Sequence, residues 1–397
     1  MNIAYLQPMR LPNPFAHSIQ VVRTCRALAE QGVQVDLFVK CLDSPDVAAA
    51  LSYYGVSLHE NLRIDQLSIF WTGGRWRGPF FRRAVRRICR ALVATDRPPA
   101  IVFIREPDIA ERAVPVARSL GLPVLIEVHR GNLFASEPAG GPAAPLSQRL
   151  SDVERELAFY RVASGIVCLT DAHRRVLVSH GVETPITVIP DGVAMLDERQ
   201  PSDSARDLDV IYTGQLYPWK GVEAAIAAME FLPGRVLTVV GGNDAAQLKA
   251  HWDKARSLGL GERVRFVGQV PAAEVSRYLV RARVAVLPLP SSSVKARHFT
   301  SPLKLFEYMA AGTAIVASDL PSVREVLRDG QNALLVAPDS PRALAEAVAR
   351  LLGDPALAGS LAQAARRDAA QYSWAKRAER IIDFAKSVLN TASADPL

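Results

Sequence analysis

The segment that decides the fold is "FTSPLKLFEYMAAGTAIVASD", residues 299–319. It predicts a short helix with Ser301 and Pro302 at its start and Gly312 as its stop, followed at once by an apolar strand. The helix carries a carboxylate, Glu307, on what we predict to be its inward side, and small residues follow it. A helix that only packs needs no charge there. The segment therefore predicts a helix–strand unit that also meets a polar ligand.

The same alternation of helix and strand patterns extends over the whole chain of 397 residues. Short apolar runs separated by helical patterns are typical of parallel α/β layers. One series ends near residue 192, and a second begins near residue 209. We predict two Rossmann-like, doubly wound domains over residues 1–192 and 209–372, with a polar linker over 193–208 and a helix over 373–397 that packs back on the first domain. Two facing domains of this kind would leave a cleft at the carboxyl ends of their strands.

The composition is that of a globular protein, with 49% hydrophobic and 22% charged residues. The first residues lack the basic and apolar regions of a secretory signal, and no apolar run approaches the roughly 18–20 residues that span a bilayer. Cys25, Cys41, Cys89 and Cys168 have neither metal-ligand nor redox spacing, so we expect reduced core thiols. These features predict a cytoplasmic protein.

The predicted helix over residues 302–311 has the features of an anion site. Free amides near Leu303 and Lys304 would point out of its start, where the helix dipole favours phosphate. Glu307 lies on the same face, roughly 5–7 Å further along the axis at about 1.5 Å per residue. This offset fits a diphosphate at the helix start and a ribose diol on the carboxylate. The alternative is an ordinary capped helix whose Glu307 pairs with an arginine.

A second polar group follows the strand "VIYTG", where Lys220 ends the loop before the next helix. The first strand–helix turn of a doubly wound domain opens at the carboxyl edge of the sheet, so a lysine there can neutralise phosphate. The alternative is a solvated lysine at the start of a surface helix.

Four stretches, "GQLYPWKGVEAAIAAM", "RVRFVGQVP", "SPLKLFEYMAAGTAIVASDLPSVREVL" and "QYSWAKRAERI", resemble the C-terminal domain of family 4 glycosyltransferases. These are retaining, metal-independent enzymes with the two-domain GT-B fold. The resemblance covers nearly all of the second predicted domain and, more weakly, the strand order of the first. It implies that Lys220 contacts the donor diphosphate, that Glu307 contacts the ribose, and that residues Val267 and Gly268 lie beside the base.

The donor-binding residues that we predict are Gly214, Gln215, Lys220, Val267, Gly268, His298, Phe299, Thr300, Ser301, Leu303, Lys304 and Glu307. Two of them depart from the family pattern. Phe299 stands where a glutamate often contacts the donor sugar, and either His298 or Thr300 could substitute for it. Gln215 stands near the usual place of an arginine. Either Lys220 then carries more of the diphosphate charge, or Arg297 or Lys295 supplies the second cation.

In the first domain, we predict acceptor-binding residues at the carboxyl edge of the sheet. Asn13 and His17 belong to the loop and helix start after the first strand, and His17 is either an acceptor contact or an ordinary helix-start residue. His129 ends the buried strand "PVLIEVH", and Arg130 follows it. The resemblance implies that this histidine lies near the transferred sugar.

Glu127 shares a face of that strand with His129. It either orients the imidazole or forms a structural buried pair with Arg105, which we also count among the acceptor residues. We assign catalytic roles to His129, Lys220 and Glu307.

The positive charge of the chain, +7 in total, is unevenly distributed. Seven arginines and no acidic residue lie between residues 70 and 95. One interpretation is a crossover helix with solvated arginines. The other is docking on an anionic membrane, with aromatic side chains of the preceding loop at the interface. The residues predicted for membrane contact are Trp71, Trp76, Phe80, Arg82, Arg83, Arg86 and Arg87.

The sequence thus predicts a retaining, metal-independent hexosyltransferase. It would move a sugar from a nucleotide-sugar donor, preferably a UDP-sugar and next a GDP-sugar, to a glycan or lipid-linked glycan in surface polysaccharide or glycoconjugate biosynthesis. Transfer would be a front-side displacement in which the leaving diphosphate takes the acceptor proton. We interpret the "DLD" at residues 207–209 as a solvated entry to the second domain and not as a metal site. We expect no cofactor, no metal and no nucleic-acid partner. Two alternatives stay open: a catalytically silent carbohydrate-binding relative, and a GT-B epimerase or phosphorylase.

Overall fold

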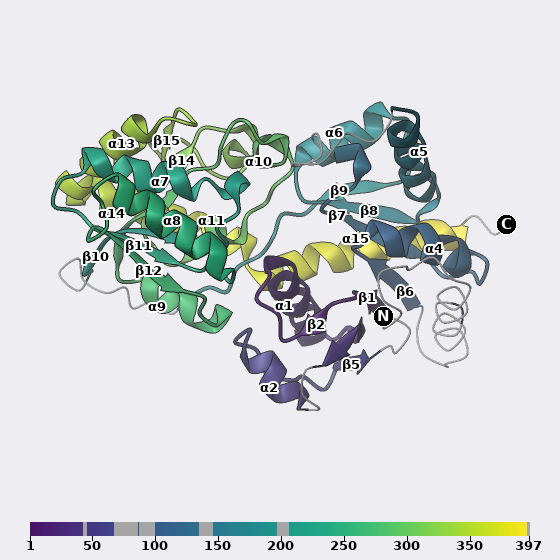
Figure 1. The fold of residues 1–397 in the computed structure, drawn as a ribbon. Helices are drawn as coiled ribbons and strands as arrows, with labels where there is room; N and C mark the ends of the chain where they lie inside the picture. Colours follow the sequence, from purple (N-terminus) through teal and green to yellow (C-terminus); the bar gives the residue numbers. More distant parts are fainter. Residues whose placement is uncertain (43–45, 67–85, 87–99, 135–145, 197–205, 395–397) are drawn as a thin grey trace. The chain divides into compact units, whose positions relative to one another are not determined.

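The computed structural model divides the chain into two compact units, one of residues 1–190 and 374–397 and one of residues 191–373 (Figure 1). The structure describes residues 1–42, 46–66, 86, 100–134, 146–196 and 206–394. The described residues of the predicted linker, 193–196 and 206–208, belong to the second unit, where Val193 pairs with Ser373 in a parallel bridge and Leu208 begins a strand.

The first unit is built on a parallel sheet with the order β5-β3-β1-β6-β7-β8-β9 among the described residues. Its strands are β1 (Asn2–Leu6), β3 (Gln34–Val39), β5 (Leu62–Gln66), β6 (Ala100–Ile104), β7 (Val124–Val128), β8 (Gly165–Cys168) and β9 (Ile186–Val188). A separate pair is formed by β2 (Arg10–Leu11) and β4 (Cys41–Leu42). The strand order reverses between β1 and β6, which makes this point the expected ligand crevice of the sheet.

Helices cover both faces of the sheet, so all five residues of β1 and all five of β7 are buried. The helices are α1 (Ala16–Glu30), α2 (Val47–Ser52), α4 (Pro107–Arg118), α5 (Leu146–Val162), α6 (Asp171–Ser179) and α15 (Trp374–Ala394). The last of these, yellow in Figure 1, packs against α1 and β8. The described cysteines Cys25, Cys41 and Cys168 are buried in this unit.

The second unit has the same kind of strand order with one strand fewer among the described residues, the parallel order β12-β11-β10-β13-β14-β15. Its strands are β10 (Leu208–Thr213), β11 (Leu237–Val240), β12 (Val264–Gly268), β13 (Ala282–Leu287), β14 (Ala314–Ser318) and β15 (Leu334–Val336). Its helices are α7 (Val222–Ala228), α8 (Ala245–Ser257), α9 (Val275–Leu279), α10 (Val294–His298), α11 (Leu303–Ala310), α12 (Pro321–Arg324), α13 (Pro341–Gly353) and α14 (Pro355–Ala369). Here the order reverses between β10 and β13.

Two apolar clusters hold this unit together, one on each face of its sheet. Alternate strand residues such as Val284 and Val286 pack under α7, α8 and α13, and Figure 1 shows α7 and α8 lying over the sheet. Their neighbours Ala285 and Leu287 pack under α9, α10, α11 and α12. Successive side chains of β13 therefore point to opposite faces of the sheet, as is usual for a strand. The sheet is thereby fixed in register, and the loops after β10 and β13 open at its carboxyl edge.

Candidate functional site

Helix α11 begins at Leu303, two residues after the predicted cap, Ser301. Pro302 is the N-cap residue, with an extended backbone, and no side chain caps the helix. The prediction of Ser301 as the cap and Pro302 as the first helical residue is therefore wrong. Ser301 Oγ instead accepts a hydrogen bond from the Asp191 amide at 3.0 Å, which places the serine outside the helix. At the other end, the predicted stop is confirmed: Gly312 has a left-handed φ of 59°.

Lys304 turns its side chain into the unit, although only its amide was predicted to matter. It is 6% exposed, and its Nζ lies 3.7 Å from the centre of the Tyr212 ring on β10. This Nζ has no hydrogen-bond partner among the described residues. Burial and the charge of Lys220 hold the pKa of Lys304 well below its ordinary value. A buried ammonium held only by an aromatic face is a cation that an anion would stabilise.

Lys220 and a third lysine share one aromatic ring. Lys220 ends a 3₁₀ turn after β10, and its Nζ lies 3.9 Å from the centre of the Trp219 ring. Lys295, on α10 after β13, places its Nζ 4.4 Å from the same centre. Burial and the charge of Lys295 lower the pKa of Lys220 to about 7, although Asp191 opposes the shift. Three ammonium groups thus gather at the carboxyl ends of β10 and β13, where the strand order reverses.

Glu307 lies one turn along α11 from Lys304 and is half-buried. Its negative charge favours the protonated form of Lys304, but it does so less strongly than burial and Lys220 disfavour it. The hydroxyl of the next residue, Tyr308, accepts a hydrogen bond from the Thr213 amide at 2.9 Å. This bond fixes α11 against the end of β10, so the carboxylate and the lysines are held by one rigid set of elements.

The remaining predicted donor residues lie in the neighbouring loops. Gln215 donates to Gln269 at 3.1 Å and accepts from the Asn243 amide at 3.3 Å, which ties together the loops after β10, β11 and β12. At the end of β12, Val267 is 39% exposed and Gly268 accepts from the Gly241 amide at 2.8 Å. An exposed apolar side chain at this edge fits contact with a flat ring.

Three more donor residues belong to the segment between α10 and α11. His298 ends α10, Phe299 is its C-cap residue, and Thr300 is buried. The rings of His298 and Phe299 lie 6.0 Å apart. Gly214, after β10, lies against Lys304: a methyl group on this glycine would come 3.7 Å from the lysine Nζ.

The "DLD" carboxylates at residues 207 and 209 belong to ion pairs. Asp207 accepts from Arg281, and Asp209 lies 3.3 Å from Arg235 Nη1 while also accepting from the Val236 amide at 3.1 Å. Both residues are at the amino-terminal end of β10, away from the lysines. Their described partners are therefore arginines and a backbone amide.

In the first unit, a charged cluster forms around Glu106, a residue that the sequence analysis missed. Glu106 follows β6 and accepts from Gln7 after β1 at 3.2 Å, from Arg105 at 3.0 Å and from Arg130 after β7 at 3.0 Å. The two arginines lower the pKa of Glu106 to about 2 against the effect of burial. Burial and the charge of Arg105 lower the pKa of His17, on the first turn of α1, to about 4. The cluster lies at the point where this sheet reverses its order.

His129 belongs to a second, more deeply buried network in the same unit. Its Nε2 is hydrogen-bonded to Oε1 of Glu127, and the other carboxylate oxygen of Glu127 accepts from Arg377 on α15. The predicted structural pair of Glu127 with Arg105 is wrong, because Arg105 pairs with the nearer Glu106. Burial, and next the charge of Arg105, lower the pKa of His129 to about 4. The predicted alternative in which Glu127 orients the imidazole agrees with this geometry.

Arg377 was missed, although the sequence contains a signal for it. The buried face of α15 includes Trp374, Ala378, Ile381 and Ala385, and Arg377 falls on the same stripe. A charged residue within the apolar stripe of an amphipathic helix needs a buried partner.

The turn after His129 depends on another missed residue, Glu156 on α5. Its carboxyl group accepts from the amides of Asn132 and Leu133 at 2.5 and 3.3 Å. A methyl group on Gly131 would lie 1.7 Å from an oxygen of this carboxyl group, so a larger residue there would displace the glutamate side chain. Burial raises the pKa of Glu156 to about 7. The predicted acceptor residue Asn13 accepts from the Phe15 amide at 2.9 Å and so shapes its own loop.

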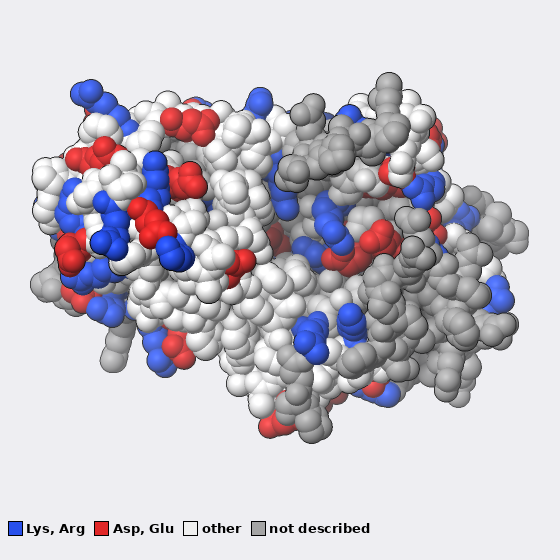
Figure 2. Space-filling view, in the orientation of Figure 1, with Lys and Arg blue, Asp and Glu red and all other residues white. Residues whose placement is uncertain are grey.

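The predicted membrane residues Trp71, Trp76, Phe80, Arg82, Arg83 and Arg87 lie outside the described residues. Arg86 is described and is exposed. On the face of the second unit in view, Figure 2 shows basic and acidic side chains intermingled, and no large patch of one sign is visible there. Of the described helices, none combines the length and the apolar character that crossing a membrane requires.

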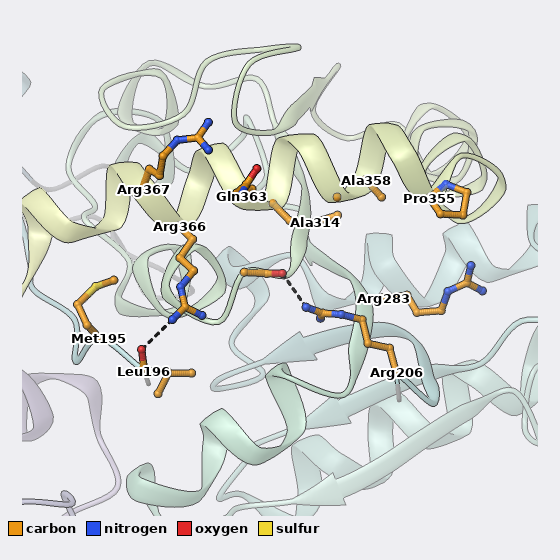
Figure 3. Close-up of a pocket in the computed structure, with 13 residues that line it drawn as sticks. Met195, Leu196, Arg206, Arg283, Ala314, Pro355, Ala358, Gln363, Arg366 and Arg367 are labelled. Atoms are coloured by element: carbon orange, nitrogen blue, oxygen red, sulfur yellow. Dashed lines mark hydrogen bonds between the residues drawn. The ribbon is translucent and has the colours of Figure 1, made fainter. Parts of the chain in front are cut away.

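The second unit also contains a pocket of about 800 Å³ at the amino ends of its strands. Its described lining includes four arginines, Arg206, Arg283, Arg366 and Arg367. As Figure 3 shows, these side chains do not converge: Arg366 donates to the Leu196 carbonyl at 2.9 Å, and Arg206 donates to the Gly312 carbonyl at 2.8 Å. The pocket lies at the edge of the sheet opposite to the lysines and contains none of the predicted site residues.

Comparison with known proteins gives matches in both units. Residues 18–195 match the family model "Glycosyltransferase Family 4", and residues 207–354 match "Glycosyl transferases group 1". The glycogen synthase of Mycobacterium tuberculosis is 30% identical over 294 residues, which cover 71% of this chain and 68% of that protein. A D-inositol 3-phosphate glycosyltransferase of Acidothermus cellulolyticus is 32% identical over 253 residues, which cover 57% of this chain and 54% of that protein.

Solved structures with the same fold cover almost the whole chain. The sucrose-phosphate synthase of Thermosynechococcus elongatus has a TM-score of 0.76 at 22% identity, with 98% of this chain and 99% of that chain covered. The HepE protein of Anabaena, solved with UDP-glucose, has a TM-score of 0.72 at 15% identity, with 98% and 100% covered.

Proposed function

Because this chain belongs to the family 4 glycosyltransferases, which are hexose-transferring enzymes with the GT-B fold, we propose that it takes its sugar from a nucleoside-diphosphate donor held by the second unit. The donor's diphosphate would lie among Lys220, Lys295 and Lys304. Transfer would retain the configuration of the anomeric carbon and would need no metal ion.

The gathering of three ammonium groups carries this proposal. Burial lowers the pKa values of two of these lysines, and the like charge of a neighbouring lysine lowers them further. A protein keeps such an arrangement where an anion will occupy it, so a perturbed cationic group at the reversal point of a doubly wound sheet favours a phosphate site. A diphosphate diester brings two negative charges to the three lysines.

Lys295, and not Arg297, is the second cation in this proposal. Its ammonium group shares the Trp219 ring with that of Lys220, and its charge is one of the causes of the lowered Lys220 pKa. Gln215, which stands near the usual place of an arginine, is engaged with Gln269 and Asn243. In this chain, the second cation of the family pattern would thus come from α10 instead of from the loop after β10.

Glu307 would accept the two ribose hydroxyls, and the exposed Val267 beside Gly268 would contact the base. We propose uracil as the base and guanine as the next choice. The Anabaena protein with the same fold was solved with UDP and with UDP-glucose, which supports this order.

In the proposed reaction, the bond between the anomeric carbon and the diphosphate oxygen breaks as the acceptor oxygen approaches the same face of the sugar. The acceptor proton passes to an oxygen of the departing diphosphate. The lysines stabilise the charge that grows on the diphosphate, which is the work that a metal ion performs in other transferases. His129 and the arginines near Glu106 would hold the acceptor, a glycan or a lipid-linked glycan.

A binding panel of UDP-, GDP- and ADP-sugars, followed by isothermal titration of the best ligand, tests the donor site. NMR of the product's anomeric proton tests retention. Lys295→Ala is expected to weaken donor binding while Arg297→Ala leaves it unchanged. Absence of binding by every nucleotide sugar would remove the proposal, and binding without transfer or hydrolysis would favour the catalytically silent carbohydrate-binding alternative.

The basic segment supports a further part of the proposal, docking of the enzyme on an anionic membrane that carries its acceptor. Sedimentation with liposomes tests this part separately. Binding should rise with the anionic lipid fraction and fall with salt. Binding that does not change with the anionic lipid fraction would contradict membrane docking.

A further inference from the structure

The first unit buries an arginine from the far end of the chain at the centre of its sheet. Arg377, on α15, is 2% exposed. Its Nε donates to Thr24 on α1 at 3.2 Å, and one terminal nitrogen donates to the carbonyl of Ile189 at 2.9 Å and also to that of Pro190. Its other terminal nitrogen donates to Glu127. Every nitrogen of the guanidinium group is therefore engaged.

Glu127 is the point where these elements meet. Its side chain is completely buried, and its Oε1 accepts from Gln20 on α1 at 2.7 Å and is bonded to His129 Nε2. A carboxylate without water is stable as an ion only beside a positive charge. Arg377 supplies this charge directly, and for that reason the pKa of Glu127 is about 2 in spite of burial.

An ionised carboxylate can only accept hydrogen bonds. His129 must then place its ring hydrogen on Nε2, which leaves Nδ1 as a hydrogen-bond acceptor. If Glu127 were protonated, it would donate to Nε2, and the ring hydrogen would move to Nδ1. The form of the histidine that meets the substrate therefore depends on the charge of Glu127.

From this geometry, we infer that Arg377 is a positioning residue of the enzyme: through Glu127, it fixes the tautomer and orientation of His129. The inference rests on the proposed role of His129 in the acceptor half of the site. The helix α15 would therefore contribute to the function of the site, beyond the contribution of a buried ion pair to stability.

Among the described residues, no other group facing Glu127 can replace Arg377 as its partner. Tyr5 on β1 and Cys25 on α1 are neutral at physiological pH, since burial and the Glu127 charge both raise their pKa values. Arg105, after β6, acts on the pair as a positive charge but forms its ion pair with Glu106. Arg377 is the cation bonded to Glu127 in the described part of the unit.

The experiment is NMR of the imidazole nitrogens, with the His129 signals assigned by their loss in His129→Gln. The wild-type enzyme is expected to show a neutral ring with hydrogen on Nε2 between pH 5.5 and 8. In Arg377→Met, the pair should take up one proton at neutral pH. That proton resides either on the imidazole, giving hydrogen on both nitrogens, or on Glu127, moving the ring hydrogen to Nδ1. In both cases, Nδ1 becomes protonated.

Activity supplies the second measurement. In Arg377→Met, kcat/KM for transfer should fall on the order of tenfold or more, as for other residues that orient a catalytic group, while nucleotide-sugar affinity stays unchanged. Arg377→Lys, which keeps the charge, should restore part of the activity and the Nε2 tautomer. The matched control is Arg263→Met in the second unit. Arg263 is half-buried and donates to the carbonyls of Met229 and Leu232, with no carboxylate in its bonds.

A folded Arg377→Met protein that keeps a neutral ring, with hydrogen on Nε2 and none on Nδ1, would overturn the inference. If this variant does not fold, the wild-type spectrum still decides, because a ring hydrogen on Nδ1 or a charged imidazole at pH 7 would contradict it equally. Failure of the wild-type protein to bind any nucleotide sugar would remove the proposed function but leave the NMR result valid.

Discussion

Lys220 makes donor affinity depend on pH in a predictable direction. With the pKa of Lys220 at about 7 in the free enzyme, roughly nine-tenths of this residue is protonated at pH 6 and roughly one-tenth at pH 8. A diphosphate binds the protonated form and raises its pKa, so binding above pH 7 must first add a proton. The apparent Kd should therefore rise about tenfold between pH 6 and pH 8, which corresponds to about 1.4 kcal/mol.

Isothermal titration with UDP-glucose measures this effect. The sugar nucleotide is suitable because its diphosphate is a diester and does not titrate in this range. Repeating the titration in two buffers with different ionisation enthalpies gives the number of protons taken up, to which Lys220 should contribute about 0.1 at pH 6 and about 0.9 at pH 8.

Two variants separate Lys220 from the other lysines. Lys220→Arg keeps a charge that does not titrate, so it should remove the contribution of Lys220 to the pH dependence and retain much of the affinity. Lys249→Gln removes an exposed lysine that pairs with Asp253 on α8, and it should leave both quantities unchanged. A wild-type enzyme that binds UDP-glucose without proton uptake at pH 8 would refute the reasoning, as would a Lys220→Arg variant that keeps the wild-type slope.

The other predictions concern the ribose contact, the buried lysine, metal independence and a tight turn. Glu307→Ala should weaken UDP-glucose binding by on the order of 100-fold, since it removes two hydrogen bonds to a charged group; titration showing wild-type affinity would contradict the ribose assignment. Lys304→Met should raise the melting temperature of the free protein and weaken donor binding, because it replaces a buried cation with an apolar chain of similar length; a lower melting temperature would count against it. Transfer in excess EDTA should proceed at the untreated rate, and loss restored by a divalent ion would show that a metal takes part. Gly221→Ala should destabilise the second unit by more than about 2 kcal/mol in urea unfolding, because the new methyl group would lie 1.7 Å from the Pro288 carbonyl oxygen. Gly234→Ala is its control, with a similar positive φ and nothing within 4 Å, and an equal loss in both variants would refute the steric argument.

The sequence predicted those parts of the site that follow from local pattern and topology. Lys220 and the start of α11 both come after strands of one parallel sheet, so the alternation alone placed them at the same edge. The position of Gly312 followed from the same local rules. The resemblance of the second unit to a known family added the identity of the expected ligand.

The sequence could not predict contacts between residues far apart in the chain. Glu127 and Arg377 are separated by 250 positions, and no local pattern links a strand to a helix over that distance. The same limit explains the wrong pairing of Glu127 with Arg105. Arg105 is closer to Glu127 in sequence than Arg377 is, but it forms its ion pair with the adjacent Glu106. The N-cap error at Ser301 has a related cause, because its hydroxyl is used by Asp191, 110 positions away.

The order in which a ribosome delivers this chain gives the last helix a further meaning. Residues 191–373 form a contiguous unit, and all of it is translated before the helix that completes the first unit. Until then, the acid at position 127 has no guanidinium to neutralise it, and the groove that receives the helix exposes apolar surface to water. The first unit, whose residues 1–190 are synthesised first, thus completes its folding last.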